Sequence, residues 1–213
     1  MLKLYDYFRS SASYRVRIAL NLKGLKYEAV PVHLVNNGGE QHSLDYQTIN
    51  PQSLVPALDD HGKILTQSLA IIEYLDEMHP EVPLLPKEPY LKAKVRAFAL
   101  AIAADTHPVN NLRVTQYLTR EFNISAEQKL AWYHHFIMLG LSALEKQLVT
   151  STTLGNFCFG DHPSLADICL IPQLYNAKRF DCDLSSCPTL NNIDKHCQTL
   201  NAFNDARPME TIT

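Results

Sequence analysis

The sequence predicts a two-part fold: an α/β domain over residues 1–80 and an all-α domain over residues 90–213, joined by a proline-rich linker at 81–89. Strand and helix patterns alternate about every ten residues through the first part, as in an α/β sandwich. Prolines at 80, 83, 86 and 89 then exclude regular structure. Beyond them the periodic patterns are almost all helical. The chain has 213 residues and is 46% hydrophobic, which is sufficient for a buried core.

The first part is predicted to run strand, helix, strand, short helix, strand, strand, helix. Its opening strand-loop-helix pattern implies a parallel crossover between the first two strands. Gly24 is placed to end the first helix, and Pro31 indicates an edge position for the second strand. The run Asp59-Asp60-His61-Gly62 is typical of a hairpin turn. The expected strands are 2–7, 27–35, 54–58 and 63–66, and the expected helices are 14–23, 43–49 and 68–78.

The second part is predicted to be a helical bundle. Expected helices cover 90–122 with an interruption near Pro108, 126–148, 164–180 and 189–203. Ser164 and Asp167 have the spacing of a capping box, with aspartate in place of glutamate.

Composition excludes several classes of protein. A net charge of −3 argues against a nucleic-acid-binding role. No apolar run approaches the roughly 20 residues of a membrane span, and the N-terminus lacks the pattern of a secretory signal.

The five cysteines lie in the last third without a CxxC pair, so we expect reduced thiols in a cytoplasmic protein and neither disulfides nor zinc. His134 and His135 are adjacent and would face different sides of a helix, so no metal site is predicted.

The loop from Arg9 to Ser13 is the first candidate site. Its hydroxyls lie where a helix leaves its first N–H groups unpaired, a position that stabilises an anion such as a thiolate. The loop has no cysteine, so any sulfur nucleophile must come with a ligand. Capping of the helix by Ser13 is the alternative interpretation.

Two further positions could hold a peptide-like ligand. Pro56 within an apolar strand marks either an edge or a cis turn. A cis bond would turn the backbone groups of Val55 outward to pair with an extended ligand. Gln67 and Ser68 precede a helix, where Ser68 could cap the helix or help to bind a carboxylate.

In the helical part, the polar run from His107 to Arg113 interrupts a helix and could be a kink beside a cleft or a merely solvated kink. Arg179 lies near a predicted helix end, where a surface cation is common.

In combination these features resemble the zeta class of the cytosolic glutathione transferases. The resemblance is strongest in the stretch from Tyr7 to Leu20 and covers nearly the whole chain. The other matching segments are Asn50-Pro51, 54–58, 67–75, 107–113, Ala166-Asp167, Pro172-Gln173 and 176–180. This class includes maleylacetoacetate isomerase, and the maleylpyruvate isomerases are similar. The resemblance implies a thioredoxin-like N-terminal domain that binds glutathione, a helical domain for the second substrate, and a homodimer.

The resemblance also assigns roles to residues. Ser10 would hold the glutathione thiolate with Ser11 beside it, and Arg9 and Arg179, with Arg113, would pair with substrate carboxylates. The implied glutathione-binding residues are Ser10, Ser11, Ala12, Ser13, Tyr14, Arg15, Gln41, Val55, Gln67, Ser68, His107, Asn111, Leu112 and Arg113.

The implied reaction is a cis-to-trans isomerisation with glutathione as cofactor. The substrate would be a small anionic cis alkene, as in the conversion of maleylacetoacetate to fumarylacetoacetate in aromatic amino-acid breakdown. The thiolate would add to the double bond, rotation would follow, and elimination would release the trans isomer. Ala12 stands where the zeta pattern has a cysteine, which calls into question an auxiliary role for that cysteine.

Other functions share these features. A general glutathione-conjugating or peroxide-reducing enzyme would have the same glutathione contacts, and the arginines favour an anionic substrate instead. A non-catalytic transferase-like module would have no need for Ser10, Ser11, Val55, Gln67 and Ser68 together. The sequence does not separate maleylacetoacetate from maleylpyruvate as substrate.

Overall fold

The computed structural model describes residues 1–208 and divides into two compact units. One unit comprises Met1–Leu84 together with the described residues from Leu200 onward, and the other comprises Leu85–Thr199. The sequence placed residues 90–213 in a single helical domain. In the structure the described residues from Leu200 onward pack on the first unit instead. Phe203 is fully buried there, and its carbonyl accepts a hydrogen bond from the Tyr14 hydroxyl at 3.3 Å.

The first unit is built on a four-stranded sheet in the order β2-β1-β3-β4. Strand β1 (Leu2–Asp6) pairs parallel with β2 (Tyr27–Pro31) and antiparallel with β3 (Ala57–Asp60), which pairs antiparallel with β4 (Lys63–Thr66). The parallel crossover, the edge position of the strand that contains Pro31, and the hairpin at His61 and Gly62 are confirmed. Strand β2 ends four residues earlier than predicted, at the proline that cannot donate to the ladder.

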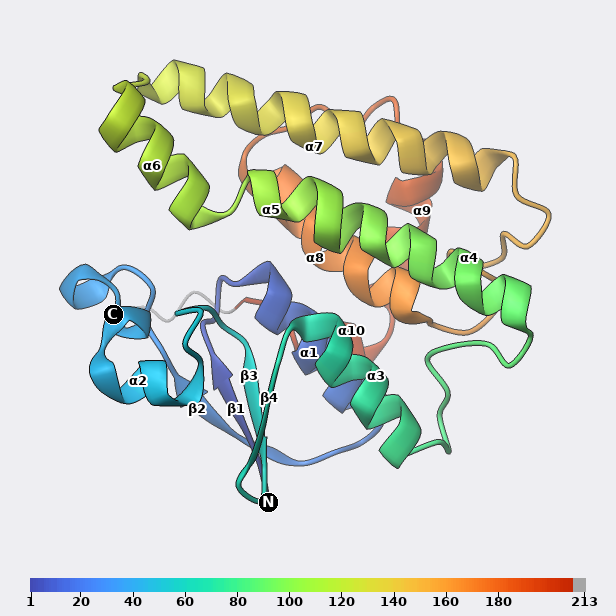
Figure 1. The fold of residues 1–213 in the computed structure, drawn as a ribbon. Helices are drawn as coiled ribbons and strands as arrows, with labels where there is room; N and C mark the ends of the chain where they lie inside the picture. The colour runs from blue at the N-terminus through green and yellow to red at the C-terminus, as the bar shows by residue number, and fades with distance from the viewer. Residues whose placement is uncertain (209–213) are drawn as a thin grey trace. The chain divides into compact units, whose positions relative to one another are not determined.

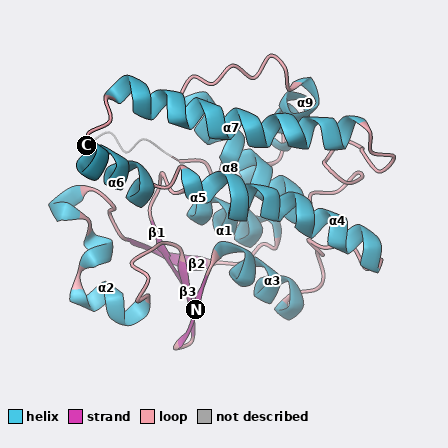
Figure 2. Cartoon of the chain, turned by 45° about the horizontal axis from the view of Figure 1, so that its top comes forward, coloured by secondary structure: helices cyan, strands magenta, loops and turns pink. Residues whose placement is uncertain are grey.

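Helices cover both sides of this sheet. Helices α1 (Ser11–Leu22) and α3 (Ser68–Met78) lie on one side and α2 (Leu44–Ile49) on the other (Figures 1 and 2). Short 3-10 turns at Asn36–Gly38 and Glu40–His42 precede α2, and α10 (Asn201–Asn204) packs on α1. The sheet core includes fully buried Leu4 and Leu58.

Helix α1 begins three residues before the predicted start. The hydroxyl of Ser10 accepts a hydrogen bond from the Ser13 amide at 3.2 Å, so Ser10 is the N-cap. Gly24, with φ of +64°, follows the helix in the left-handed conformation that glycine adopts without a steric penalty.

The second unit is helical. Helix α4 (Pro89–Leu100) packs on α8 (Leu165–Arg179), and α7 (Ala126–Val149) and α8 both contact α9 (Pro188–Cys197). Helix α4 continues into a π-helical turn, η3 (Ala101–Thr106), then α5 (His107–Val109) and α6 (Leu112–Phe122). The interruption expected near Pro108 is confirmed, whereas the single helix predicted over 189–203 is wrong because the chain turns after Cys197 into α10.

The predicted capping box of α8 is confirmed. Asp167 is fully buried, and its carboxylate accepts hydrogen bonds from the Ser164 amide and hydroxyl at 2.8 and 2.9 Å and from the Cys158 amide at 2.8 Å.

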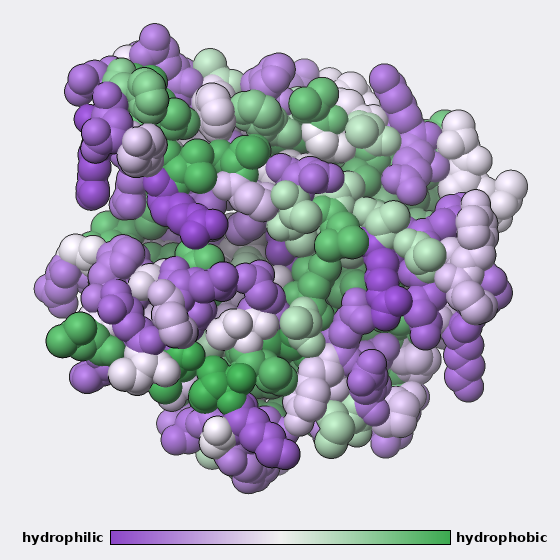
Figure 3. All heavy atoms as spheres, in the orientation of Figure 1, coloured by the Kyte–Doolittle hydropathy of each residue, from purple (hydrophilic) through white to green (hydrophobic). Residues whose placement is uncertain are grey.

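No helix among residues 1–208 is long and apolar enough to cross a membrane. The five cysteines are all free and buried. On the face shown in Figure 3, hydrophobic side chains lie among hydrophilic ones.

Candidate functional site

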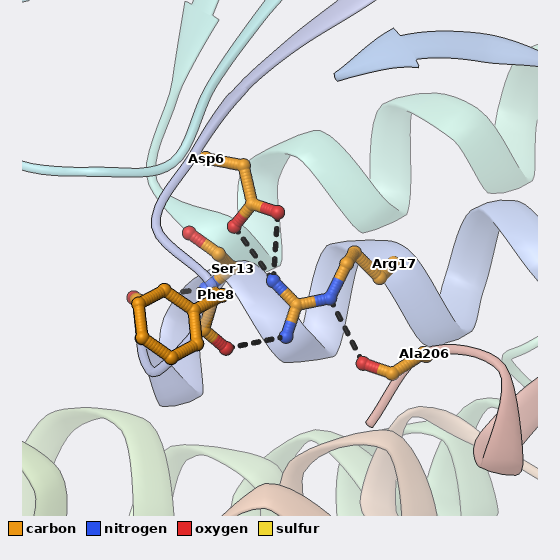
Figure 4. Close-up of polar contacts among 6 residues, drawn as sticks. Asp6, Phe8, Ser13, Arg17 and Ala206 are labelled. Atoms are coloured by element: carbon orange, nitrogen blue, oxygen red, sulfur yellow. Dashed lines mark hydrogen bonds and ion pairs between the residues drawn. The ribbon is translucent and has the colours of Figure 1, made fainter. Parts of the chain in front are cut away.

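The loop after β1 is fixed by the buried side chain of Arg17. From α1 its guanidinium donates to both carboxylate oxygens of Asp6 at 2.6 and 2.8 Å and to the Phe8 carbonyl at 3.1 Å (Figure 4). It also donates to the Ala206 carbonyl at 2.9 Å, which joins the segment that follows α10 to the same cluster. A buried guanidinium with all these acceptors holds the backbone just before Ser10 in one place. This role of Arg17 was not predicted from the sequence, although an arginine between the apolar residues Val16 and Ile18 of a helix indicates a buried polar contact.

Ser10 is both a helix cap and an available donor. Its oxygen accepts the amide hydrogen of Ser13, which uses no hydroxyl hydrogen. No residue among 1–208 accepts a hydrogen bond from that hydroxyl. Ser10 can therefore donate to an anion at the N-terminus of α1, where the helix dipole also favours negative charge. Capping by Ser13, the alternative interpretation, is wrong.

The other predicted residues of this loop divide into exposed and buried groups. Arg9 is exposed, with its guanidinium 5.0 Å from the centre of the Phe8 ring. Ser11 and Ala12 are half-buried in the first turn of α1, whereas Ser13 and Tyr14 are buried. Helix α1 thus presents its first residues outward and turns the later ones into the core.

The peptide bond between Val55 and Pro56 is cis, one of the two outcomes that the sequence allowed. The preceding carbonyl of Leu54 accepts hydrogen bonds from the Tyr46 hydroxyl and from Asn50 Nδ2, both at 2.7 Å. Burial raises the pKa of Tyr46, so the phenol stays a neutral donor. No residue among 1–208 forms a hydrogen bond with the Val55 backbone. Its amide and carbonyl are therefore available to an extended ligand while the segment beside them is fixed.

At the start of α3 the N-cap is Gln67, not Ser68 as the sequence suggested. Gln67 has φ of +70°, and its side chain makes no cap bond but donates to Gln52 Oε1 at 2.9 Å. Ser68 is the first helical residue and is buried, and its hydroxyl accepts from Arg15 Nη1 at 3.3 Å. Arg15 is itself almost fully buried, so it lies behind Ser68. The first amides of α3 are left without a side-chain cap, which suits a ligand carboxylate.

Gln41 is buried in the 3-10 turn before α2. Its Nε2 lies 3.4 Å from the Leu34 carbonyl, and its Oε1 has no partner among the described residues. A buried amide oxygen without a donor is costly unless a ligand or water supplies one. Gly39 lies so close that a Cβ there would be 2.5 Å from the Gln41 amide, so the glycine permits this placement.

In the helical unit the predicted residues fall on two segments. The residues from His107 to Arg113 form α5 and the start of α6, where the Asn111 side chain caps α6 by accepting from the Arg113 amide at 3.2 Å. His107, Asn111 and Leu112 are half-buried and Arg113 is exposed. Arg179 is exposed in the last turn of α8, with its guanidinium 5.2 Å from the centre of the Phe180 ring.

Comparison with known proteins identifies the family. The model of the glutathione S-transferase N-terminal domain matches residues 1–77, and that of the C-terminal domain matches residues 137–183. The chain is 51% identical over 205 residues to a probable maleylacetoacetate isomerase of Vibrio cholerae, covering 96% of this chain and 94% of that protein.

Two solved structures are similar over nearly the whole chain. One is the holo structure of a bacterial maleylpyruvate isomerase, described as a zeta-class glutathione transferase, with TM-score 0.94, 42% identity, and coverage of 97% of this chain and 96% of that one. The other is maleylacetoacetate isomerase of Methylobacterium extorquens AM1 with bound malonate and glutathione, with TM-score 0.93, 42% identity and the same coverage. The α/β and helical units are therefore the thioredoxin-like and all-helical domains of the glutathione transferase fold, and this chain belongs to the zeta-class glutathione transferases, the family of the maleylacetoacetate and maleylpyruvate isomerases.

Proposed function

We propose that this chain is a glutathione-dependent cis–trans isomerase that converts maleylacetoacetate to fumarylacetoacetate. The observation that carries the proposal is the placement of Ser10, which caps α1 through its oxygen and keeps its hydroxyl hydrogen for an anion. The chain's own thiols are all free and buried, so the attacking sulfur must be supplied by a ligand. The 51% identical relative that is named for this activity supports the choice of reaction.

The unsatisfied groups of the first unit fit glutathione. The Val55 amide and carbonyl suit the backbone of its cysteinyl residue, as in strand addition. The uncapped start of α3, with Gln67 and Ser68, suits its γ-glutamyl carboxylate. The partnerless Oε1 of Gln41 suits an N–H of the tripeptide. Among residues 1–208, the Val55 backbone and Gln41 Oε1 have no hydrogen-bond partner and α3 has no side-chain cap, so the residues present fit this cofactor.

When bound, glutathione supplies a thiolate that adds to the cis double bond and leaves after rotation about the resulting single bond. The chain's part is to hold and orient. The Ser10 hydroxyl and the α1 N-terminus hold negative charge on sulfur and so lower the pKa of the thiol. Ser11 lies beside them in the first turn. Arg17 keeps the loop fixed through Phe8, so the donor is in place before the reaction begins.

Arginines bind the acid substrate in this proposal. Arg9 in the first unit and Arg179 and Arg113 in the second carry exposed guanidinium groups that can pair with carboxylates. His107, Asn111 and Leu112 are proposed to line the binding surface of the helical unit and to contact glutathione. A charge-assisted pair with the carboxylates would also stabilise the enolate formed on addition.

The test follows cis-to-trans conversion of maleylacetoacetate and of maleylpyruvate by the purified chain, with and without glutathione. We expect conversion that requires glutathione and does not consume it, with maleylacetoacetate preferred. Undiminished turnover without glutathione would overturn the proposal. A preference for maleylpyruvate would reassign the substrate and leave the mechanism intact. Net formation of a glutathione conjugate with no trans product would indicate a general transferase.

We further propose a cytoplasmic homodimer. Five free, buried cysteines suit a reducing compartment. Light scattering on a sizing column should give twice the 24.1 kDa chain mass.

A further inference from the structure

Three consecutive residues of α7, Trp132, Tyr133 and His134, contact both segments of the helical unit to which we assign substrate contacts. On the first segment, Trp132 Nε1 donates to the Val109 carbonyl at 3.0 Å, and the Tyr133 hydroxyl donates to the Asn110 carbonyl at 2.6 Å. Both acceptors lie directly before Asn111. Helix α7 thus fixes the backbone from which Asn111 to Arg113 project.

The same helix fixes the end of α8. The ring of Tyr133 stacks on Phe180, with centroids 4.0 Å apart and an interplanar angle of 26°, and His134 Nε2 lies 2.6 Å from the Phe180 carbonyl. Phe180 is the ring over which the Arg179 guanidinium lies. The exposed guanidinium of Arg179 is therefore oriented by the ring of Phe180. Helix α7 holds Phe180 in two ways, through the stacked ring of Tyr133 and through the contact of His134 with the Phe180 carbonyl.

Tyr133 contacts both segments with one side chain: its hydroxyl binds the first and its ring supports the second. Burial raises the pKa of its phenol while the positive charge of Arg179 opposes the shift, so the hydroxyl remains a neutral donor close to that arginine. A phenol has few rotatable bonds, which makes it a stiff connection between the two segments.

We propose that Tyr133 is a positioning residue that fixes Arg179 relative to the segment from His107 to Arg113 and thereby sets the affinity for the carboxylates of the acid substrate. The inference rests on the proposed function. Arg179 is a long exposed side chain that loses rotamer freedom when it pairs with a carboxylate. Holding it in advance over Phe180 reduces that loss, and bidentate pairing makes the affinity sensitive to small displacements. Tyr133 itself touches no reacting atom in this scheme.

The experiment compares Tyr133→Phe, which loses only the hydroxyl, with Tyr133→Leu, which also loses the stacked ring. Tyr117→Phe is the matched control, because Tyr117 is 60% exposed on α6 and its ring pairs only with Phe122 in the contacts described for it. For each variant, the dissociation constants of maleate and of glutathione are measured by calorimetry. KM for each substrate and kcat are measured by isomerisation. The emission of Trp132, the single tryptophan, reports on the contact with Val109.

Loss of one hydrogen bond predicts that Tyr133→Phe weakens maleate binding and raises KM for the acid substrate about three- to tenfold. We expect a larger effect on maleate binding and on this KM for Tyr133→Leu, with Trp132 emission shifted. Glutathione affinity should fall less than maleate affinity, because the main glutathione-binding groups lie in the first unit. The Tyr117→Phe control should match the wild type throughout.

Unchanged maleate affinity in Tyr133→Phe would overturn the proposal. Equal losses of maleate and glutathione affinity in that variant would also overturn it, and so would a wild-type chain that does not bind maleate. Failure of the proposed function is seen separately, as absent isomerisation by the wild type. A result in which maleate binding depends on Tyr133 in a chain without isomerase activity would support the positioning role and reject the function.

Discussion

Replacing Ser10 by alanine should damage catalysis far more than folding. The cap bond from the Ser13 amide is 3.2 Å long, at the upper end of the usual range, so its loss should cost about 0.5–1 kcal/mol of folding free energy. A hydrogen bond to a charged sulfur contributes about 1.5–3 kcal/mol. Losing it should raise the pKa of the bound glutathione thiol by about 1–2 units, because one unit corresponds to 1.36 kcal/mol.

The matched control is Ser125→Ala. Ser125 caps α7 by accepting from the Gln128 amide at the same 3.2 Å, and it lies in no proposed site. Its hydroxyl also donates to Glu127 Oε2 at 2.7 Å, so denaturant unfolding should show a loss of stability for Ser125→Ala at least as large as that for Ser10→Ala. The thiolate absorbance of bound glutathione, followed against pH, should shift upward only in Ser10→Ala, and turnover at saturating glutathione should fall at least about tenfold near neutral pH. If Ser10→Ala and Ser125→Ala turn over equally fast, Ser10 does not hold the thiolate and the proposed mechanism is wrong.

Three further predictions concern stability and thiol chemistry. Asp6→Asn leaves the buried guanidinium of Arg17 without its ion partner and should lower the free energy of unfolding by about 3 kcal/mol, measured with urea; a loss below about 1 kcal/mol would mean that solvent already screens the pair. Burial raises the pKa of four of the five cysteines, so Ellman's reagent should react with all five only after unfolding; rapid reaction of one thiol in the native protein would contradict this burial. Hydrogen bonds from the Tyr90 and Leu91 amides lower the pKa of Glu88, so its contribution to stability is present above the unfolded-state pKa and is lost as the pH falls through the folded-state value. Glu88→Gln should therefore flatten the acid side of the stability profile, and identical profiles would show that this cap does not affect the measured stability.

Local sequence signals predicted most of the elements because the interactions that define them are local. Helix α3 and strand β4 have the predicted bounds, and the capping box of Ser164 and Asp167 forms as its spacing indicated. The predicted helix boundaries were wrong where the sequence offers two possible cap residues or where a tertiary contact ends the helix. The start of α1 moved because Ser10 rather than Ser13 accepts the cap bond, and the last predicted helix broke because Phe203 is buried against α1.

The site was predictable only in part. The loop hydroxyls, Val55 and the residues at the start of α3 stand at fixed offsets from recognisable turns, so the sequence alone identified them as candidates. Which of them are exposed could not be seen, because burial depends on segments distant in the chain. Arg15 and Tyr14, for example, are covered through contacts with Ser68 and Phe203, 53 and 189 residues away.

The sequence by itself determined the order of strands and helices, the proline break and the absence of a thiol in the first two thirds of the chain, since each depends on neighbouring residues or on composition. The tertiary structure alone decided that Arg17 holds the Ser10 loop and that Tyr133 joins Asn110 to Phe180. Those contacts join residues from different elements of the fold, and they form because a buried polar group must find its partner wherever the packed chain places one.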